Sequence, residues 1–207
     1  MAETTAEMVR QLRDKTGAGM MDCKRALDAT QGDMNKAIDW LREKGQAIAQ
    51  SKSSRATRQG RIHSYIHHTG TVGVLLELTC ETDFVARNPE FHELATDLSM
   101  HVAAHAPRFL SREDVPPELV EREKAVYRTQ ALNEGKPEKI LERIAEGKLV
   151  KFYQENCLLD QPFVRDEDIT IKQLIEQKIA KMRENITVRR FVRYQLGEAI
   201  EGGEPGR

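Results

Sequence analysis

The sequence lacks the features that identify several large classes of protein. It has only three cysteines, Cys23, Cys80 and Cys157, and no CxxC pair, which argues against a disulfide framework and against a zinc ribbon. No apolar run approaches the ~20 residues of a membrane span, and the start, MAETTAEM, has no cationic flank before an apolar stretch. We therefore expect a soluble, cytoplasmic protein with reduced thiols and no membrane association.

A surplus of charge of either sign is also missing. The 32 lysines and arginines nearly balance the 33 aspartates and glutamates, which leaves a formal net charge of −1. The chain as a whole is therefore not predicted to bind nucleic acid by electrostatic attraction, and any basic site must be local. The length of 207 residues suits one domain of moderate size and a small one.

Motifs of catalysis are scarce. The sequence has no glycine-rich phosphate loop and no GxSxG. His101 and His105 stand four residues apart, as zinc-binding helical pairs do, but Val-Ala-Ala lies between them where HExxH carries its glutamate. This pattern favours two histidines that continue the core-facing stripe of a helix, so we predict no metal site.

One cysteine could pair with a histidine as a nucleophile and its base. Cys80 ends a predicted strand, and the neighbouring strand carries three histidines: His63, His67 and His68. Cys80 lies on the buried face of its strand, which favours a packing role. A thiol or metal hydrolase stays open as an alternative, although no enzyme and no cofactor is predicted.

The amino-terminal part predicts three short helices closed by glycines. Thr4 and Glu7 form a capping-box pattern, and Asp33 caps the third helix, which Gly45 is expected to end. A module of this size, residues 1–45, is better suited to docking than to catalysis.

Residues 46–61 follow as a basic linker. They carry cations among serines and have no apolar periodicity after Ile48. A solvated tether is the expectation for such a run, and contact with phosphate or an acidic partner is the alternative.

The sequence then changes to a period of two. RIHSYIHH and TVGVLLELTCET flank a Thr69-Gly70 turn and predict an antiparallel hairpin with one buried face. Helical patterns fill most of the chain from Asn88 onward, and TVRRFVRYQL predicts one last strand. The fold class is therefore α+β, with a small antiparallel sheet packed with helices in residues 62–200 and a disordered tail at 201–207.

Phe84 stands in the polar connection between the second strand and the next helix, in CETDFVARNP. A ring at such a corner either tucks under the sheet or stays exposed. An exposed ring would act as a wedge, because it gains roughly 1.5–3 kcal/mol on entering an apolar pocket of a partner. Next to it, the carboxylate of Asp83 would repel a phosphate or disturb the water around a magnesium ion.

Two long motifs resemble the signatures of the bacterial elongation factor Ts family. ELTCETDFVAR, at 77–87, is similar to the TDFV signature, and LRDKTGAGMMDCKRAL, at 12–27, is similar to the signature of the amino-terminal module. Three further stretches look alike: HVAAHAPRFLSREDVP, LLDQPFV and RFVRYQLGEAIE. The resemblance covers nearly the whole chain, which is similar to the short form of the family because it lacks one half of the core that longer members carry.

The resemblance implies a guanine-nucleotide exchange factor for elongation factor Tu, the GTPase that carries aminoacyl-tRNA to the ribosome. In the family, a three-helix module similar to ubiquitin-associated (UBA) domains docks on the GTPase, and the TDFV loop inserts there and dislodges magnesium. Carried onto this sequence, the loop comprises Thr82, Asp83, Phe84 and Val85. The implied docking residues of the amino-terminal module are Arg13, Met20, Met21 and Lys24.

Two further expectations concern partners. A helical adaptor that binds ubiquitin-like proteins or RNA through residues 1–61 is the alternative function. A homodimer is expected because a sheet of about three strands has two edges to cover, and because His101 and His105 continue an apolar helix stripe as if they met another surface. The dimer contact would lie in residues 62–200.

Overall fold

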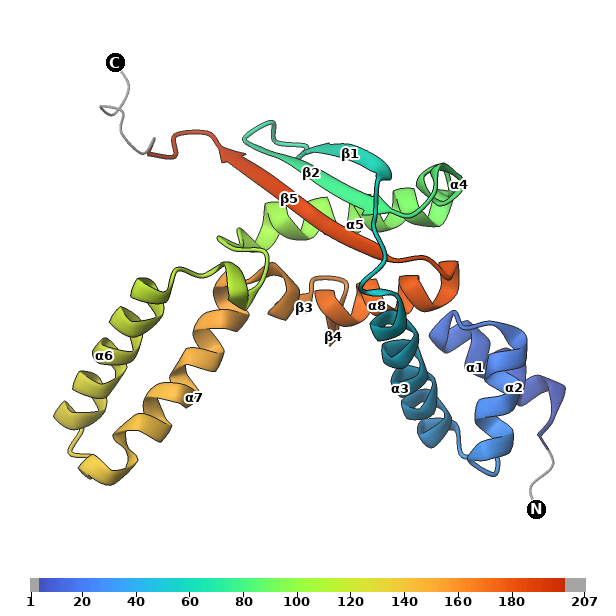
Figure 1. The fold of residues 1–207 in the computed structure, drawn as a ribbon, viewed down its shortest axis with the longest axis horizontal. Helices are drawn as coiled ribbons and strands as arrows, with labels where there is room; N and C mark the ends of the chain where they lie inside the picture. The colour runs from blue at the N-terminus through green and yellow to red at the C-terminus, as the bar shows by residue number, and fades with distance from the viewer. Residues whose placement is uncertain (1–3, 200–207) are drawn as a thin grey trace. The chain divides into compact units, whose positions relative to one another are not determined.

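A computed structural model describes residues 4–199 of the chain (Figure 1). Contacts divide the chain into two compact units. Unit 1 comprises residues 1–61, 79–94 and 173–187, and unit 2 comprises residues 62–78, 95–172 and 188–207. The predicted tail at 201–207 lies outside the described residues. Between residues 4 and 199, none of the helices is both long and apolar enough to cross a membrane.

Unit 1 begins with a bundle of three helices (Figure 1). They are α1 (Ala6–Thr16), α2 (Met20–Ala29) and α3 (Met34–Lys52). Gly17 ends α1 with a φ of 66°, a left-handed conformation that suits glycine. Asp33 caps α3 by accepting from the backbone N–H groups of Asn35 and Lys36. The bundle closes over buried side chains from all three helices: Val9, Leu12, Cys23, Ala26, Leu27 and Ala37.

The other segments of unit 1 include the connection that contains Phe84, which forms the one-turn helix α4 (Asp83–Ala86). On either side of it in the sequence are the end of β2 (Val72–Cys80) and the first part of α5 (Pro89–His105), and most of α8 (Ile171–Met182) also belongs to this unit. Asn88 caps α5 as predicted, since its side chain accepts from the N–H of Glu90 at 2.9 Å. Lys181 pairs with Glu90 at 2.8 Å and Lys178 with Glu93 at 3.6 Å, which ties α8 to α5.

Two predicted helix boundaries in unit 1 are wrong. Thr5, and not Thr4, caps α1, because its side chain accepts from the N–H of Met8 at 3.3 Å. Gly45 does not end α3, which continues to Lys52. Gly45 instead lies where α3 packs on α8: a Cβ built on it would stand 3.7 Å from the Cβ of Ala180.

The segment predicted as a basic linker, 46–61, is therefore largely structured. Its first part belongs to α3, and its end belongs to the first strand, β1 (Gln59–Ile66). Only residues 53–58 separate the two elements. The functional division into a docking module, a linker and a core stays a prediction.

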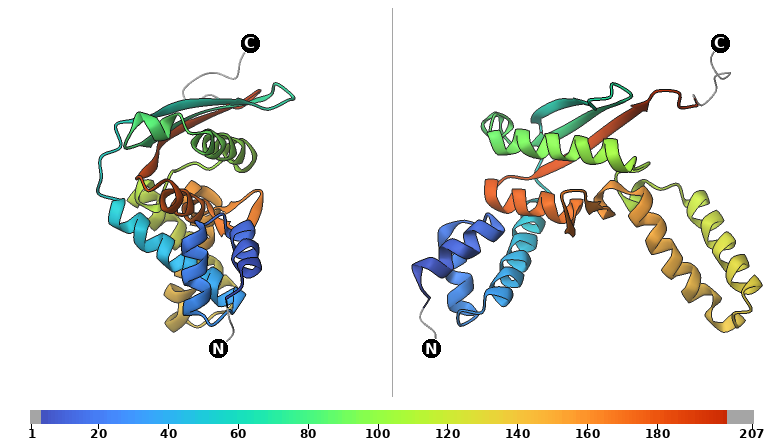
Figure 2. Two further views of the ribbon diagram at one scale, coloured as in Figure 1. Left: turned by 90° about the vertical axis from the view of Figure 1, so that its right-hand side faces the viewer. Right: turned by 180° about the vertical axis from the view of Figure 1, so that it is seen from behind.

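Unit 2 holds most of a three-stranded antiparallel sheet. Its strand order is β1, β2, β5 (Ile186–Gln195), so β1 and β5 are the edges. Figure 2 shows α5 along one face of this sheet, and Arg193 of β5 donates to the carbonyl of Ala103 in α5 at 3.2 Å. The buried residues of β2 in this unit alternate along the strand: Val74, Leu76 and Leu78. The predicted fold class, α+β, is confirmed.

A long helical hairpin also belongs to unit 2 (Figures 1 and 2). Helices α6 (Pro117–Asn133) and α7 (Glu138–Asn156) lie side by side and antiparallel. Arg128 of α6 pairs with Glu142 of α7 at 2.6 Å. The buried apolar cluster of this region comprises Val115, Leu149, Phe152 and Cys157. Two single turns of 3-10 helix flank the hairpin: η1 (Arg112–Asp114) and η2 (Leu158–Asp160).

The number of strands was underestimated. Two short strands, β3 (Pro162–Phe163) and β4 (Asp166–Thr170), form a second antiparallel pair. Neither carries the alternation by which a half-buried strand is recognised, because β3 has only two residues and β4 begins with three acidic ones. The three strands expected for the main sheet are confirmed, and the pair β3–β4 is an addition to them.

His101 does not face a partner. Its ring is fully buried in unit 2, with Nε2 3.0 Å from Oε1 of Gln161 and with Nδ1 accepting from the N–H of Val164 at 3.3 Å. His105 is exposed and stacks on His101, with ring centroids 4.5 Å apart. The expectation that this helix stripe meets another surface is therefore wrong for His101, which is satisfied within its own unit.

Candidate functional site

The segment between β2 and α5 presents Phe84 to solvent. Thr82 caps α4, because its hydroxyl oxygen accepts from the N–H of Val85 at 3.4 Å. None of the four residues of α4 is buried, and Phe84 is 83% exposed. The ring therefore does not tuck under the sheet, and a large apolar side chain stands in water on a single helical turn.

Two carboxylates anchor this turn from within unit 1. Glu184 accepts from both the N–H of Thr82, at 3.0 Å, and the hydroxyl of Thr82, at 2.6 Å. Glu81 accepts from the N–H of Asn185 at 2.7 Å and pairs with Arg55 at 3.4 Å. The hydrogen bond from Asn185 is the main reason that the pKa of Glu81 is lowered. Thr82 is thus held on its backbone and on its side chain by one acid.

Asp83 precedes Phe84 and is half exposed. Its carboxylate pairs with Arg87 at 3.0 Å, but the guanidinium of Arg87 is itself largely in solvent. An ion pair between exposed groups contributes little to stability and is readily exchanged. The carboxylate of Asp83 is therefore accessible to a partner or to an ion that the partner holds.

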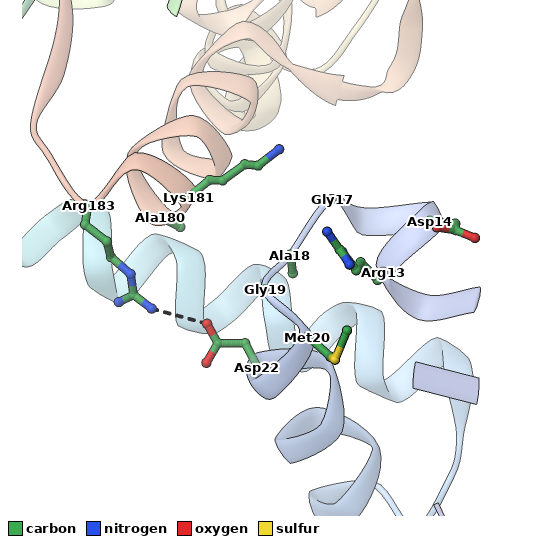
Figure 3. Close-up of a pocket in the computed structure, with 10 residues that line it drawn as sticks. All are labelled: Arg13, Asp14, Gly17, Ala18, Gly19, Met20, Asp22, Ala180, Lys181 and Arg183. Atoms are coloured by element: carbon green, nitrogen blue, oxygen red, sulfur yellow. Dashed lines mark hydrogen bonds and ion pairs between the residues drawn. The ribbon is translucent and has the colours of Figure 1, made fainter. Parts of the chain in front are cut away.

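A second exposed surface lies where α1 ends and α2 begins. Met20 and Met21 are large apolar side chains that stay exposed, and Arg13 and Lys24 are exposed as well. A pocket of about 670 Å³ opens at this surface (Figure 3). Its lining includes Arg13, Gly17, Met20, Asp22, Lys181 and Arg183. Met21 and Lys24 are not among the lining residues.

Asp22 connects α2, α3 and the end of α8 within unit 1. Its carboxylate accepts from Lys44 at 2.7 Å and from Arg183 at 3.2 Å, the second contact being drawn in Figure 3. The hydrogen bond from Lys44 is the largest cause of the lowered pKa of Asp22. Because Arg183 and Glu184 are neighbours, the three-helix bundle and the Phe84 turn are both bound to the same end of α8.

The site residues implied by the family resemblance fall in one compact unit. The loop, residues 82–85, and the proposed docking residues of the amino-terminal module all belong to unit 1. Sequence reasoning missed the charged and polar residues that hold them: Asp22, Glu81, Lys181, Arg183, Glu184 and Asn185. A charged residue at the end of a helix gives no local signal of a partner that lies far away in the chain.

Cys80 is unsuited to act as a nucleophile. It is fully buried, and its Sγ donates to the carbonyl of Thr82 at 3.1 Å. Burial raises the pKa of the Cys80 thiol to about 11, so the reactive thiolate is scarce near neutral pH. Within residues 4–199, no three His, Cys, Asp or Glu side chains are grouped so that they could hold a metal ion.

The chain is similar to known proteins over nearly its full length. The family described as "Elongation factor TS" matches residues 2–198. The chain belongs to the elongation factor Ts family. It is 55% identical to Elongation factor Ts of Desulforamulus reducens, over 97% of this chain and 93% of that protein. It is 56% identical to Elongation factor Ts of Fervidobacterium nodosum, over 95% of this chain and 100% of that protein. Membership of this elongation factor Ts family makes the protein a translation elongation factor.

Proposed function

We propose that this protein binds the GTPase elongation factor Tu in its GDP form in the cytoplasm and promotes the release of GDP. The observation that carries the proposal is Phe84, which is 83% exposed on an anchored turn. An exposed aromatic ring gains free energy when it enters an apolar pocket of a partner. No active site of its own is required, so the protein acts as an exchange factor and not as an enzyme.

The two exposed surfaces of unit 1 have separate roles in this proposal. The surface at the start of α2 docks on the GTPase through Arg13, Met20, Met21 and Lys24. The loop, Thr82–Val85, inserts beside the nucleotide. Phe84 is the wedge, and the accessible carboxylate of Asp83 disturbs the bound magnesium ion and repels the phosphate. Docking supplies affinity, and the loop weakens the hold of the GTPase on GDP.

Thermodynamic linkage constrains this mechanism. If the factor weakens GDP binding by some ratio, GDP weakens the binding of the factor by the same ratio. The complex with the empty GTPase is then tight, and incoming nucleotide dissolves it. The factor changes the rate of exchange and supplies no driving force.

The test is the release of fluorescent GDP from elongation factor Tu, chased by excess unlabelled GDP, at increasing concentrations of this protein. The observed rate should rise and reach a plateau, which separates half-saturation, a measure of docking, from the maximal rate. A rate that stays at the spontaneous value at every concentration of the protein rules the proposal out.

We also propose that the protein is a homodimer through unit 2. The face of the sheet away from α5, here called the outer sheet face, carries exposed apolar side chains from all three strands: Ile62, Ile66, Leu75, Val192 and Tyr194. Tyr194 is 69% and Ile66 66% exposed. A two-fold contact would cover this face on both copies at once.

A further inference from the structure

The turn that ends α8 contacts three separate segments of unit 1. It consists of Arg183, Glu184 and Asn185, here called the anchor turn, and Arg183 has a φ of 61°, which few residues other than glycine adopt. The N–H of Arg183 donates to the carbonyl of Ile179 at 2.8 Å, so the turn is tied to α8 itself. Each of its side chains points to a different part of the unit.

Arg183 reaches the three-helix bundle through Asp22 at 3.2 Å. Asn185 donates from its side chain to the carbonyls of Arg55, at 2.8 Å, and Ser53, at 3.3 Å, in the segment that follows α3. The N–H of Asn185 donates to Glu81, at the end of β2. The anchor turn is thus bound both to the segment that leaves the bundle after α3 and to Glu81, just before the loop.

Glu184 holds the loop itself. The hydroxyl of Thr82 donates to its carboxylate at 2.6 Å. The oxygen of this hydroxyl is then free to accept from the N–H of Val85. Glu184 therefore sets the direction of the hydrogen bond that caps α4, as well as fixing the N–H of Thr82.

Packing contributes little to this task, because α4 has a single turn and no buried residue. The backbone hydrogen bonds of the turn fix its local shape, and the hydrogen bonds from Thr82 to Glu184 fix the turn to the rest of unit 1. Hydrogen bonds to a charged acceptor are about twice as strong as neutral ones, and Thr82 makes two of them to one carboxylate.

We propose that the anchor turn is a positioning element, which sets the Phe84 loop relative to the amino-terminal module so that one partner engages both together. Glu184 is its positioning residue for the loop, and Arg183 fixes the module. The inference rests on the proposed exchange function, and it adds a residue, Glu184, that belongs neither to the loop nor to the docking residues of the amino-terminal module.

The test compares Glu184→Gln and Glu184→Ala with the wild type in two assays. In the GDP-release assay, Glu184→Ala should lower the plateau rate about tenfold, the effect expected from losing charge-assisted hydrogen bonds, and should change the half-saturating concentration less than about threefold. Glu184→Gln keeps an acceptor oxygen and should lose less. Glu146→Gln, on exposed Glu146 of α7, is the matched control and should behave as the wild type.

Amide hydrogen exchange on the protein alone is the second assay. Loss of Glu184 should speed exchange at Thr82 and Val85 without changing the protection of the α1–α3 bundle. If the wild type fails to stimulate GDP release, the proposed function fails. The amide hydrogen exchange rates still decide whether Glu184 positions the loop. The inference is overturned if Glu184→Ala leaves the amide hydrogen exchange at Thr82 and Val85 unchanged. It is also overturned if the wild type stimulates GDP release and the variant has the same plateau rate. Should Glu184→Ala unfold, the same criteria apply to Glu184→Gln.

Discussion

The ring of Phe84 contacts solvent over most of its surface, so its removal should cost the fold little. We expect Phe84→Ala to change the free energy of unfolding by less than about 0.5 kcal/mol, as other surface substitutions do. The same change should lower the plateau rate of GDP release at least about tenfold, because the ring would contribute roughly 1.5–3 kcal/mol in a pocket of the partner.

The control for Phe84→Ala is Leu132→Ala, which removes another exposed apolar side chain, in α6. It should leave GDP release unchanged. Normal release by Phe84→Ala would remove the wedge from the mechanism.

Asp83 should matter chiefly through the metal. Asp83→Asn keeps the size of the side chain and loses the charge that would disturb a magnesium ion. We expect the variant to slow GDP release much more when magnesium is present than when a chelator has removed it. An equal loss under both conditions would show that Asp83 acts by another route.

His101 should make stability depend on pH. Burial lowers the pKa of His101 from 6.5 to about 4, so between these values the unfolded chain binds a proton that the native protein does not. Stability is therefore complete above the unfolded pKa and is lost as the pH falls toward 4, by up to roughly 3 kcal/mol. Urea unfolding at about pH 7 and about pH 4.5 measures this loss.

The matched variants for this test are His101→Asn and His68→Asn. His101→Asn should show a smaller difference between the two pH values than the wild type, although it is less stable at both, because its buried hydrogen bonds are lost. His68 is exposed, and its replacement should keep the full difference. An undiminished pH effect in His101→Asn would assign the titration to other groups.

Only part of the candidate site could be predicted from the sequence. Phe84 stands out locally, because it is a large apolar side chain in polar, turn-forming surroundings, but these surroundings do not decide whether the ring is buried or exposed. Met20 and Met21 follow from the family resemblance and not from a local pattern. Glu184 could not be found in this way. It lies 102 residues from Thr82, and a glutamate after a helix looks the same whether it binds water or a distant backbone.

Alanine substitutions at three glycines, two inside helices and one at a helix end, distinguish the effect of backbone conformation on stability from the effect of packing. Gly45→Ala and Gly147→Ala should each stabilise the protein by up to about 1 kcal/mol, because alanine favours a helix interior and the new Cβ meets only ordinary contact at Gly45 and open space at Gly147. Gly17→Ala should destabilise it by about 1 kcal/mol, because Gly17 has a φ of 66°. Urea unfolding of the three variants checks the signs, and a loss of stability in Gly45→Ala would mean that α3 and α8 leave no room for a methyl group.

The helices and strands that could be predicted from the sequence are those whose boundaries are set by local chemistry. The start of α3 at Asp33 and of α5 at Asn88 follow from local capping chemistry, and both are confirmed. Gly45 was misleading because glycine is typical of helix ends, whereas here it lies inside α3, beside Ala180 and with room for a Cβ. The strands β3 and β4 were missed because pairing, and not pattern, defines them.

The outer sheet face should determine the oligomeric state. Light scattering at micromolar concentration should give twice the chain mass of 23.6 kDa. Ile66→Asp, which places a charge on this face, should yield the single-chain mass while the fold is kept. Leu132→Asp, on exposed α6, should remain dimeric, and a wild-type mass of one chain would exclude the dimer at that concentration.

Unit 1 is assembled from segments that the ribosome makes far apart in time. The loop residues are present once synthesis passes residue 85, but their carboxylate support is added only with Glu184. A nascent or prematurely released chain that ends before this point carries residues 82–85 without the carboxylate that holds the N–H and hydroxyl of Thr82. The proposed exchange activity should therefore arise late in synthesis, so that unfinished chains leave the GTPase undisturbed.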